Sequence, residues 1–327
     1  MRRPRIATGC FRWNVLATLF AFVASAFGRL HAAQFEPFDK AEFGAIVSAN
    51  AKLERLATGM KFTEGPVWVN RDAGYLVFSD IPSDELKILT VTDVMTLLKK
   101  YRKPSSNANG NTVDRQGRLI TCEHSGRRVS ILEDDGTLRT LVDRHDGKKF
   151  NSPNDVVVKS DGSVWFTDPS YGLPKGETKE QEGNYVFRFD PKTKATAIVA
   201  KDFDMPNGLC FSPDEKKLYI ADSGKPHHIR AFDVQPDGTV AGGGVFCVID
   251  NGVPDGIRCD AQGRIFSSAG DGVHIFSTDG KLIGKILVPE TPANLCFGGA
   301  DGKTLFITAQ TSLYSIKLKN QGPKGTR

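Results

Sequence analysis

A short sequence phrase that recurs six times restricts the folds open to this chain more than any other feature. In residues 253–266 it consists of a Pro-Asp-Gly turn, a short apolar strand, a glycine-containing hairpin turn and a second strand. Repetition every 40 to 54 residues is typical of repeat folds, in which each copy forms one structural unit. The second strand aligns in all copies, on Leu76, Leu119, Val164, Leu218, Ile265 and Leu305.

Each copy predicts short β-strands joined by tight turns. Most aligned strands follow a turn rich in Asp, Gly or Lys, such as Asp161-Gly162, because hairpin turns need residues that tolerate positive φ. Later strands of the copies, such as residues 184–190 and 229–233, are rich in strand-forming residues. Units of this length with about four strands are typical of β-propellers. The sequence therefore predicts an all-β fold, a six-bladed β-propeller around a central channel, as one domain over residues 57–318.

The segments around the repeats complete this domain plan. Residues 34–56 are predicted to form an N-terminal arm, and residues 51–57 to supply the outer strand of the last blade and so close the ring. The charged stretch 174–183 lies in the longest gap between copies and is predicted to be a surface loop, with a lid over the channel mouth as the less favoured alternative. Residues 319–327 are predicted to be a flexible tail.

Residues 1–33 have the pattern of a secretory signal peptide. Arginines precede an apolar run over residues 15–27, and small residues follow up to Ala26 and again up to Ala33, which is the favoured cleavage point. The run is shorter than the roughly 20 residues of a membrane span. The sequence thus predicts a secreted or periplasmic protein without stable membrane insertion after cleavage, a monomer or weak homo-oligomer.

The charge balance and the cysteines exclude several classes of protein. The chain has 43 basic and 38 acidic side chains, and five of the basic ones lie in residues 1–33, so the mature protein is balanced and nucleic-acid binding is not indicated. The remaining cysteines match neither a zinc motif nor a dense disulfide framework. They are predicted to be buried thiols, with a single bridge such as Cys247 to Cys259 as the alternative. These cysteines are Cys122, Cys210, Cys247, Cys259 and Cys296.

Every copy carries one acidic or amide residue ten to twelve positions before its aligned strand residue. Because the first strand of each propeller blade lines the axis, we expect these residues to surround one end of the channel, and we call them the channel ring. Two carboxylates and four amides suit a hard cation, Ca²⁺ first and Mg²⁺ or Mn²⁺ next. Zn²⁺ is a further alternative, although the set is too poor in His and Cys to prefer structural zinc. The channel ring is Glu64, Asn109, Asn154, Asn207, Asp255 and Asn294.

A purely structural explanation competes with the ligand hypothesis. Asn-Gly and Asp-Gly are common turn pairs, but turns would accept Gly or Ser equally well, so in-phase recurrence in six copies favours ligands. For Asn109 and Asn294, a turn or supporting role is as well supported as ligation. For Glu64 and Asp255 the ligand hypothesis is favoured, because a carboxylate in a narrow channel costs several kcal/mol unless it is compensated.

A second set of acids lies four residues after the aligned positions. For Asp80 and Asp222 we expect capping of the turn after the second strand, whereas Asp168, together with His124, is predicted to lie nearer the channel mouth. The remaining histidines, among them His274, are expected to be exposed or in loops. There is no nucleophile-elbow motif, no P-loop and no dinucleotide-binding fingerprint, so a Ser-His-Asp triad is unsupported.

Four of the recurring motifs together resemble the SMP-30/gluconolactonase family. They are Glu-Gly-Pro-Val-Trp at 64–68, Ser-Pro-Asn-Asp at 152–155, Pro-Asn-Gly at 206–208 and Pro-Asp-Gly at 254–256, and the resemblance covers residues 53–317. The resemblance implies a six-bladed propeller with one catalytic divalent cation. Carried over by motif, its ligands are Glu64, Asn154, Asn207 and Asp255, which the repeat phase also selects among its six.

The resemblance and the ring chemistry together predict a lactonase. The cation would polarise the carbonyl of a sugar lactone, with glucono-1,5-lactone favoured, and Asp255 would also activate water as a general base. Asn109, His124 and Asp168 are the candidates for holding sugar hydroxyls. Some sugar lactonases of the family have Arg two residues before the middle ligand, where this chain has Ser152. The alternatives are a phosphotriester hydrolase on the same metal ring, or a non-catalytic propeller that binds a carbohydrate or a protein.

Overall fold

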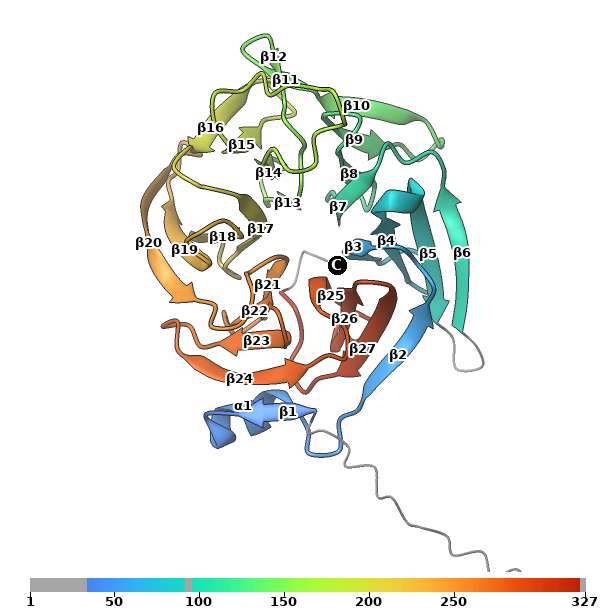
Figure 1. Ribbon diagram of the computed structural model, residues 1–327, viewed down its shortest axis with the longest axis vertical. Helices are drawn as coiled ribbons and strands as arrows, with labels where there is room; N and C mark the ends of the chain where they lie inside the picture. Colours follow the sequence, from blue (N-terminus) through green and yellow to red (C-terminus); the bar gives the residue numbers. More distant parts are fainter. Residues whose placement is uncertain (1–33, 92–95, 324–327) are drawn as a thin grey trace, which may run out of the picture. The chain divides into compact units, whose positions relative to one another are not determined.

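The six sequence repeats form six antiparallel sheets arranged around a central channel (Figure 1). The computed structural model describes residues 34–91 and 96–323, so the predicted signal peptide lies outside the described residues. The predicted six-bladed β-propeller is confirmed. The four strands that line the channel in blades 1 to 4 are β3 (Thr63–Val69), β7 (Ala108–Val113), β13 (Val156–Val158) and β17 (Pro206–Phe211), followed by β21 (Ile257–Cys259) and β25 (Pro292–Gly298) in blades 5 and 6.

The outer strands follow the same order in every blade. Each aligned repeat residue lies in the second strand, which pairs with the inner strand through a short turn. The second strands are β4 (Tyr75–Asp80), β8 (Leu119–Glu123), β14 (Val164–Asp168), β18 (Lys217–Asp222), β22 (Ile265–Ser268) and β26 (Thr304–Ala309). The third are β5 (Glu85–Val91), β9 (Arg128–Leu132), β15 (Tyr185–Phe189), β19 (His228–Val234), β23 (Gly272–Phe276) and β27 (Ser312–Lys317). The fourth strands of blades 1 to 5 are β6 (Thr96–Arg102), β10 (Leu138–Val142), β16 (Thr196–Ala200), β20 (Val240–Val248) and β24 (Leu282–Leu287).

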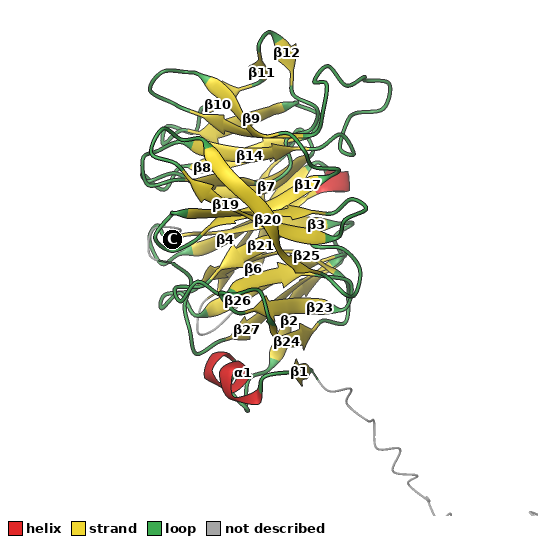
Figure 2. Cartoon of the chain, turned by 90° about the vertical axis from the view of Figure 1, so that its left-hand side faces the viewer, coloured by secondary structure: helices red, strands yellow, loops and turns green. Residues whose placement is uncertain are grey.

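The N-terminal arm contributes strands to the last two blades. β2 (Leu53–Thr58) is the outer strand of blade 6, where Leu53 is opposite Ile316 of β27, the position expected for residues 51–57. β1 (Phe35–Pro37) adds a fifth strand to blade 5 beside β24, and helix α1 (Lys40–Ile46) follows it (Figure 2). Asp39 begins this helix by accepting hydrogen bonds from two backbone N–H groups of its first turn. The helix buries Phe43 and Ile46 in the core shared by blades 5 and 6.

The hydrophobic core is divided among the interfaces between neighbouring blades. Between blades 6 and 1, Trp68 stacks on Phe306 with ring centroids 5.5 Å apart. Between blades 2 and 3, Phe150 contacts both Phe166 and Phe187 at centroid distances of 5.0 and 4.9 Å. Each blade therefore depends on its neighbours for burial, which favours one cooperative ring.

Several local expectations are changed by the structure. Residues 319–323 belong to the predicted flexible tail, but Asn320 is buried and donates to Asp260 at 2.6 Å, so this part is packed on blade 5. His274, expected in an exposed position, is fully buried in β23 beside Asp271. The five cysteines of the described region are buried and free, so the alternative bridge is not formed. None of the described helices has the length and hydropathy needed to cross a bilayer.

The insertion 174–183 is held by contacts to Arg127 and to residues 148–149. Glu177 forms an ion pair of 2.8 Å with the buried Arg127. Glu180 accepts from the backbone N–H of Lys149, and Gln181 donates to the carbonyl of Lys148 at 2.9 Å. The insertion is thus anchored to the hairpin formed by β11 (Arg144–His145) and β12 (Lys148–Lys149).

Candidate functional site

The six channel-ring residues lie where the inner strands enter the channel. In four blades the strand register shifts at this point, which is the sign of a β-bulge. In blades 3 and 5 the inner strand begins just after the ring residue. A bulge re-aims a side chain that regular pairing would place elsewhere. Five of the ring residues are buried, and Asp255 alone is partly exposed.

The glycine that follows most ring residues allows the blades to meet at the ring. A Cβ on Gly65 would lie 2.0 Å from the carbonyl oxygen of Asn109, and one on Gly208 would lie 2.2 Å from that of Asp255. The N–H of Gly208 donates to this same Asp255 oxygen at 3.1 Å. The Asn-Gly and Asp-Gly pairs are therefore used for close approach between blades, rather than only for turns.

Hydroxyl groups on second strands hold the next blade's ring segment. Ser79 donates to the carbonyl of Asn109 at 2.6 Å, and Thr167 donates to that of Asn207 at 2.8 Å. Ser268 donates to the carbonyl of Ala293 at 2.8 Å. The sequence analysis missed these residues, although their shared position three residues after the aligned aliphatic residue was a usable signal.

Three of the four side-chain amides of the ring form a continuous hydrogen-bonded series. Asn109 donates to the Oδ1 of Asn154, and Asn154 donates to the Oδ1 of Asn207 at 2.6 Å. Asn207 in turn donates to Ser223 at 2.9 Å, and Ser223 donates to the carbonyl of Pro254 at 2.6 Å. The series connects blades 2 to 5. The Oδ1 of Asn109 is buried without a hydrogen-bond partner among the described residues.

Three carboxylates share the centre of the channel. Burial and the charge of Asp155 raise the pKa of Glu64 to about 7, although hydrogen bonds from Asn294 and Gly65 lower it. Burial, Glu64 and Asp155 raise the pKa of Asp255 well above its usual range. The positively charged side chain of Arg258 contacts one of these carboxylates, with its Nη1 3.2 Å from the Oδ2 of Asp155. If all three carboxylates are ionised, two negative charges remain uncompensated in a buried place.

This donor set fits a divalent cation. The described residues hold no group of three or more His, Cys, Asp and Glu side chains arranged to bind one ion, so a cation at the ring would need amide oxygens as well as carboxylates. Glu64, Asn154, Asn207 and Asp255 offer them, and the unpartnered oxygen of Asn109 lies in the same ring. Oxygen donors and an excess of two negative charges are the features expected of a Ca²⁺ or Mg²⁺ site.

Two of the three predicted substrate contacts lie beside the ring. The Nε2 of His124 is 3.1 Å from the amide nitrogen of Asn109, and burial lowers the pKa of this histidine to about 4, so its imidazole is neutral. Asp168, by contrast, is fully buried, and its carboxylate accepts from the backbone N–H of Asn151 at 2.8 Å. The structure places Asp168 beneath the loop that carries Asn154 rather than in the mouth.

The other acids of this second set also support the ring loops. Asp80 accepts from the backbone N–H groups of Lys61 and Phe62, and Asp222 accepts from that of Met205 at 2.8 Å. For Asp80 the expected capping of the turn after the second strand is corrected to capping of the loop before the inner strand. For Asp222 the expectation is confirmed, because its Oδ1 also accepts from the N–H of Gly224 in the following turn at 3.0 Å. Both segments lie at the same end of the antiparallel pair.

The mouth also contains Tyr171, which the sequence analysis did not select. Ser152 donates to the carbonyl of Pro169 at 2.6 Å and accepts from the N–H of Gly172 at 3.0 Å, so the loop between them is fixed. Gly172 packs so closely on His124 that a Cβ would lie 2.5 Å from its Nδ1. The Tyr171 side chain is 47% exposed, yet burial and the charges of the channel carboxylates raise the pKa of its phenol.

A cavity of about 410 Å³ lies among the inner strands, on the side of Arg258 away from the ring. Its lining includes Asn111, Val156 and Arg258 from three inner strands, and Trp68 and Phe297 from blades 1 and 6. This lining mixes apolar side chains with charged ones, among them Asp114, Asp214 and Glu215. Arg258 lines this cavity and also pairs with Asp155 at the centre of the channel.

Comparison with known proteins was made for both sequence and structure. The family model for the SMP-30/Gluconolactonase/LRE-like region matches residues 62–311. A gluconolactonase from Zymomonas mobilis is 33% identical over 305 residues, covering 85% of this chain and 84% of the relative. Among solved structures, a putative gluconolactonase has a TM-score of 0.83 and 36% identity, covering 89% of this chain and 99% of its own. A gluconolactonase from Xanthomonas campestris has a TM-score of 0.81 and 34% identity, covering 88% and 96%.

Proposed function

This chain belongs to the SMP-30/gluconolactonase/LRE-like family, and from this premise we propose that it is a divalent-cation-dependent hydrolase that opens a sugar lactone. The observation that carries the proposal is the channel ring, in which oxygen donors converge on a mouth with two uncompensated negative charges. The similarity to gluconolactonases from two organisms supports glucono-1,5-lactone or a related aldonolactone as the substrate.

Four residues would hold the cation, namely Glu64, Asn154, Asn207 and Asp255. When bound, a divalent cation supplies Lewis-acid polarisation of a carbonyl and offsets negative charge that develops on its oxygen. The amide series that runs from Asn109 to Ser223 fixes the orientation of the two asparagine ligands before any ion arrives. Such preorganisation lowers the reorganisation needed during the reaction.

Asp255 is the proposed general base. It is the partly exposed member of the ring, so water and substrate can reach its carboxylate. A carboxylate within reach of the attacking water can accept its proton in the transition state. The water oxygen forms a bond to the lactone carbonyl carbon as its proton passes to Asp255. When the ring C–O bond breaks, that proton goes to the departing oxygen, and the product is the open hydroxy acid.

The remaining polar groups of the mouth are suited to sugar hydroxyls. His124 is neutral, so one ring nitrogen donates and the other accepts. Asn109 contacts His124 within the ring, and burial together with the charges of Asp255 and Glu64 raises the pKa of the Tyr171 phenol. Asp168 is withdrawn from this role because its carboxylate is buried beneath the loop before Asn154.

The test is a lactonase assay on residues 34–327, the mature chain that the signal-peptide prediction gives for a secreted or periplasmic protein. Glucono-1,5-lactone hydrolysis should be lost on chelation and restored by adding back one of Ca²⁺, Mg²⁺, Mn²⁺ or Zn²⁺. Circular dichroism before and after chelation controls for loss of the fold. Activity that is indifferent to chelation would refute the metal mechanism. A cation-dependent activity on phosphotriesters but not on lactones would support the alternative hydrolase, and absence of both bound ion and hydrolysis would support a binding protein.

A further inference from the structure

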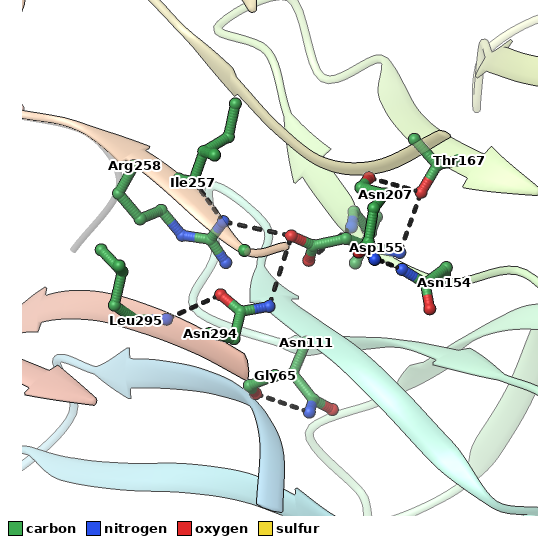
Figure 3. Close-up of polar contacts among 12 residues, drawn as sticks. Gly65, Asn111, Asn154, Asp155, Thr167, Asn207, Ile257, Arg258, Asn294 and Leu295 are labelled. Carbon is green, nitrogen blue, oxygen red and sulfur yellow. Dashed lines mark hydrogen bonds and ion pairs between the residues drawn. The ribbon is translucent and has the colours of Figure 1, made fainter. Parts of the chain in front are cut away.

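Asp155 and Arg258 form a pair of opposite charges next to the ring residue Asn294 (Figure 3). The Oδ2 of Asp155 accepts from the Nη1 of Arg258 at 3.2 Å and lies 3.5 Å from the amide nitrogen of Asn294. The same Asn294 nitrogen donates to the Oε2 of Glu64 at 2.9 Å. One amide group therefore connects this charge pair to a carboxylate that we assign to the cation.

The pair is buried and held in place. Asp155 is 1% exposed, and its second oxygen accepts from the backbone N–H of Val156 at 2.9 Å. Arg258 also donates to the carbonyl of Ile257 at 2.7 Å, and its side chain is 16% exposed, toward the cavity below the ring. Neither charge can move into bulk water, so its field at the ring is weakly screened.

The fold does not explain why an acid stands at position 155. Four of the six copies have glycine immediately after the ring residue, and the sixth has Leu295. A buried ion pair is weak support for stability, because the desolvation of both charges offsets their attraction. The effect of the pair is instead on charge. With Glu64 and Asp255 ionised, the pair keeps the centre at two net negative charges while placing a negative group nearer the ring.

We propose that the Asp155–Arg258 pair sets the net charge of the ring and thereby its selectivity for a divalent cation. The inference rests on the proposed function, because it concerns the cation that this function requires. Asp155 and Arg258 are not ligands themselves, but they would determine whether the site prefers a divalent or a trivalent ion. Removing Arg258 would leave three negative charges, removing the charge of Asp155 would leave one, and removing both would restore two.

The experiment measures cation binding, not catalysis. Isothermal calorimetry with Ca²⁺ and with Tb³⁺ is done on the wild type, Arg258→Gln, Asp155→Asn and the double variant. For unscreened charges in a buried site we expect changes of about tenfold or more. Arg258→Gln should increase the Tb³⁺ preference over Ca²⁺ by this factor, and Asp155→Asn should weaken Ca²⁺ binding by a similar factor. The double variant should return toward the wild-type preference, and Arg258→Lys should preserve it.

A matched control is available in the same blade. Arg264 forms a buried pair with Asp260 at 2.7 Å in the β21–β22 hairpin, away from the ring. Arg264→Gln breaks an equivalent pair and should leave the ratio of Tb³⁺ to Ca²⁺ affinity unchanged, even if the melting temperature falls. Should Arg258→Gln fail to fold, the comparison of Asp155→Asn with the Arg258→Lys and double variants still tests the charge rule.

The outcomes separate this inference from the function on which it rests. If the wild type binds Ca²⁺ but the Arg258 and Asp155 variants keep its ion preference, the pair is only structural and the inference is overturned. The inference is also overturned if the double variant binds Ca²⁺ more weakly than either single variant, because two purely structural losses would add. A wild type that binds no divalent or trivalent ion would overturn the metal site, and this inference with it.

Discussion

Asp255 shows how much a residue's surroundings determine its chemistry. The chain contains a second Pro-Asp-Gly tripeptide at 236–238, which forms the exposed turn between β19 and β20. In one place the acid faces two other carboxylates inside a channel, and in the other it binds only its own turn. The tripeptide is the same, so the difference comes from the blade interface.

For Asp255→Asn we expect kcat to fall by about 10²- to 10⁴-fold, the range for loss of a general base. Cation binding should persist in weakened form, because the amide oxygen remains a donor. Steady-state kinetics and calorimetry measure the two quantities separately. Asp237→Asn in the matching tripeptide is the control and should be fully active. Full activity of Asp255→Asn would remove this residue from the mechanism.

Asp168 gives a prediction about pH and stability. Burial raises its pKa to about 8 in the folded protein, above the usual value of 3.8, and its Oδ1 has no hydrogen-bond partner among the described residues. The folded state therefore holds a proton that the unfolded state releases. The resulting stability is complete below about pH 4 and is lost as the pH rises toward 8, by about 1.4 kcal/mol per pH unit at most.

Urea unfolding of the wild type and Asp168→Asn at several pH values between 4 and 8 tests this expectation. The asparagine cannot titrate, so the free energy of unfolding of the wild type should fall relative to that of the variant as the pH rises. Parallel pH dependences would show that Asp168 is ionised in the folded state.

At this scale the sequence predicted which positions surround the channel, because phase within a repeat determines which strand position faces the axis. It did not predict where flexible side chains turn. Asp168 accepts from the loop before its own ring residue, and Tyr171 lies in the long connection between β14 and β15, outside the repeat pattern. Asp155 was visible in the Ser-Pro-Asn-Asp motif, but its partner Arg258 lies in another blade.

At the scale of the strand, the ring depends on backbones that touch between blades. Gly208 of β17 has ordinary negative φ, but a Cβ there would lie 2.2 Å from the carbonyl oxygen of Asp255. Gly244 of β20, in the same blade, has nothing within 4 Å of a Cβ and also has ordinary φ. Gly208 is buried and Gly244 is exposed, so an added methyl group would meet the next blade at the first position and open space at the second.

We expect Gly208→Ala to lower the free energy of unfolding by about 1–3 kcal/mol, as overpacking does, and to weaken cation binding because the ring segments of blades 4 and 5 separate. Gly244→Ala should be neutral or slightly stabilising, by up to about 1 kcal/mol. Chemical denaturation of both variants measures the difference. Equal stabilities would mean that the blades tolerate separation at this point.

Strand prediction succeeded where the repeat pattern is strong and failed where it is absent. The second strands are the most regular part of each copy, and all six are present. β1 is three residues long and lies outside the repeats, so its pairing with β24 could not be inferred from local propensity. The bulges at the ring likewise depend on contact with the next blade.

At the scale of the whole molecule, the N-terminal arm contributes in two ways. Its first part, β1 and α1, covers the edge of blade 5 and buries Phe43 and Ile46. Its second part, β2, completes blade 6. The first part adds apolar burial to a ring that is already closed, whereas the second part closes the ring.

Deletion of residues 34–48 should leave a folded propeller whose melting temperature is lower by about 10 °C, on the order expected for losing the three buried apolar side chains Phe43, Ile46 and Val47. Deletion of residues 34–58 should abolish the cooperative transition and cause aggregation, because it exposes the edge of β27. Circular dichroism melting and gel filtration measure both effects. Similar behaviour of the two deletions would show that β2 does not determine closure.

Because β2 pairs with β27, the order in which the chain is synthesised differs from the order in which the ring can be completed. Leu53 is made early but has to wait for Ile316, so β2 has no partner while five blades leave the ribosome. All four proposed cation ligands are synthesised before blade 6, yet blades 1 and 5 are joined through it. A cation could therefore be enclosed only at the end of translation, and a chain terminated before β27 would carry the complete ligand set without an enclosed site.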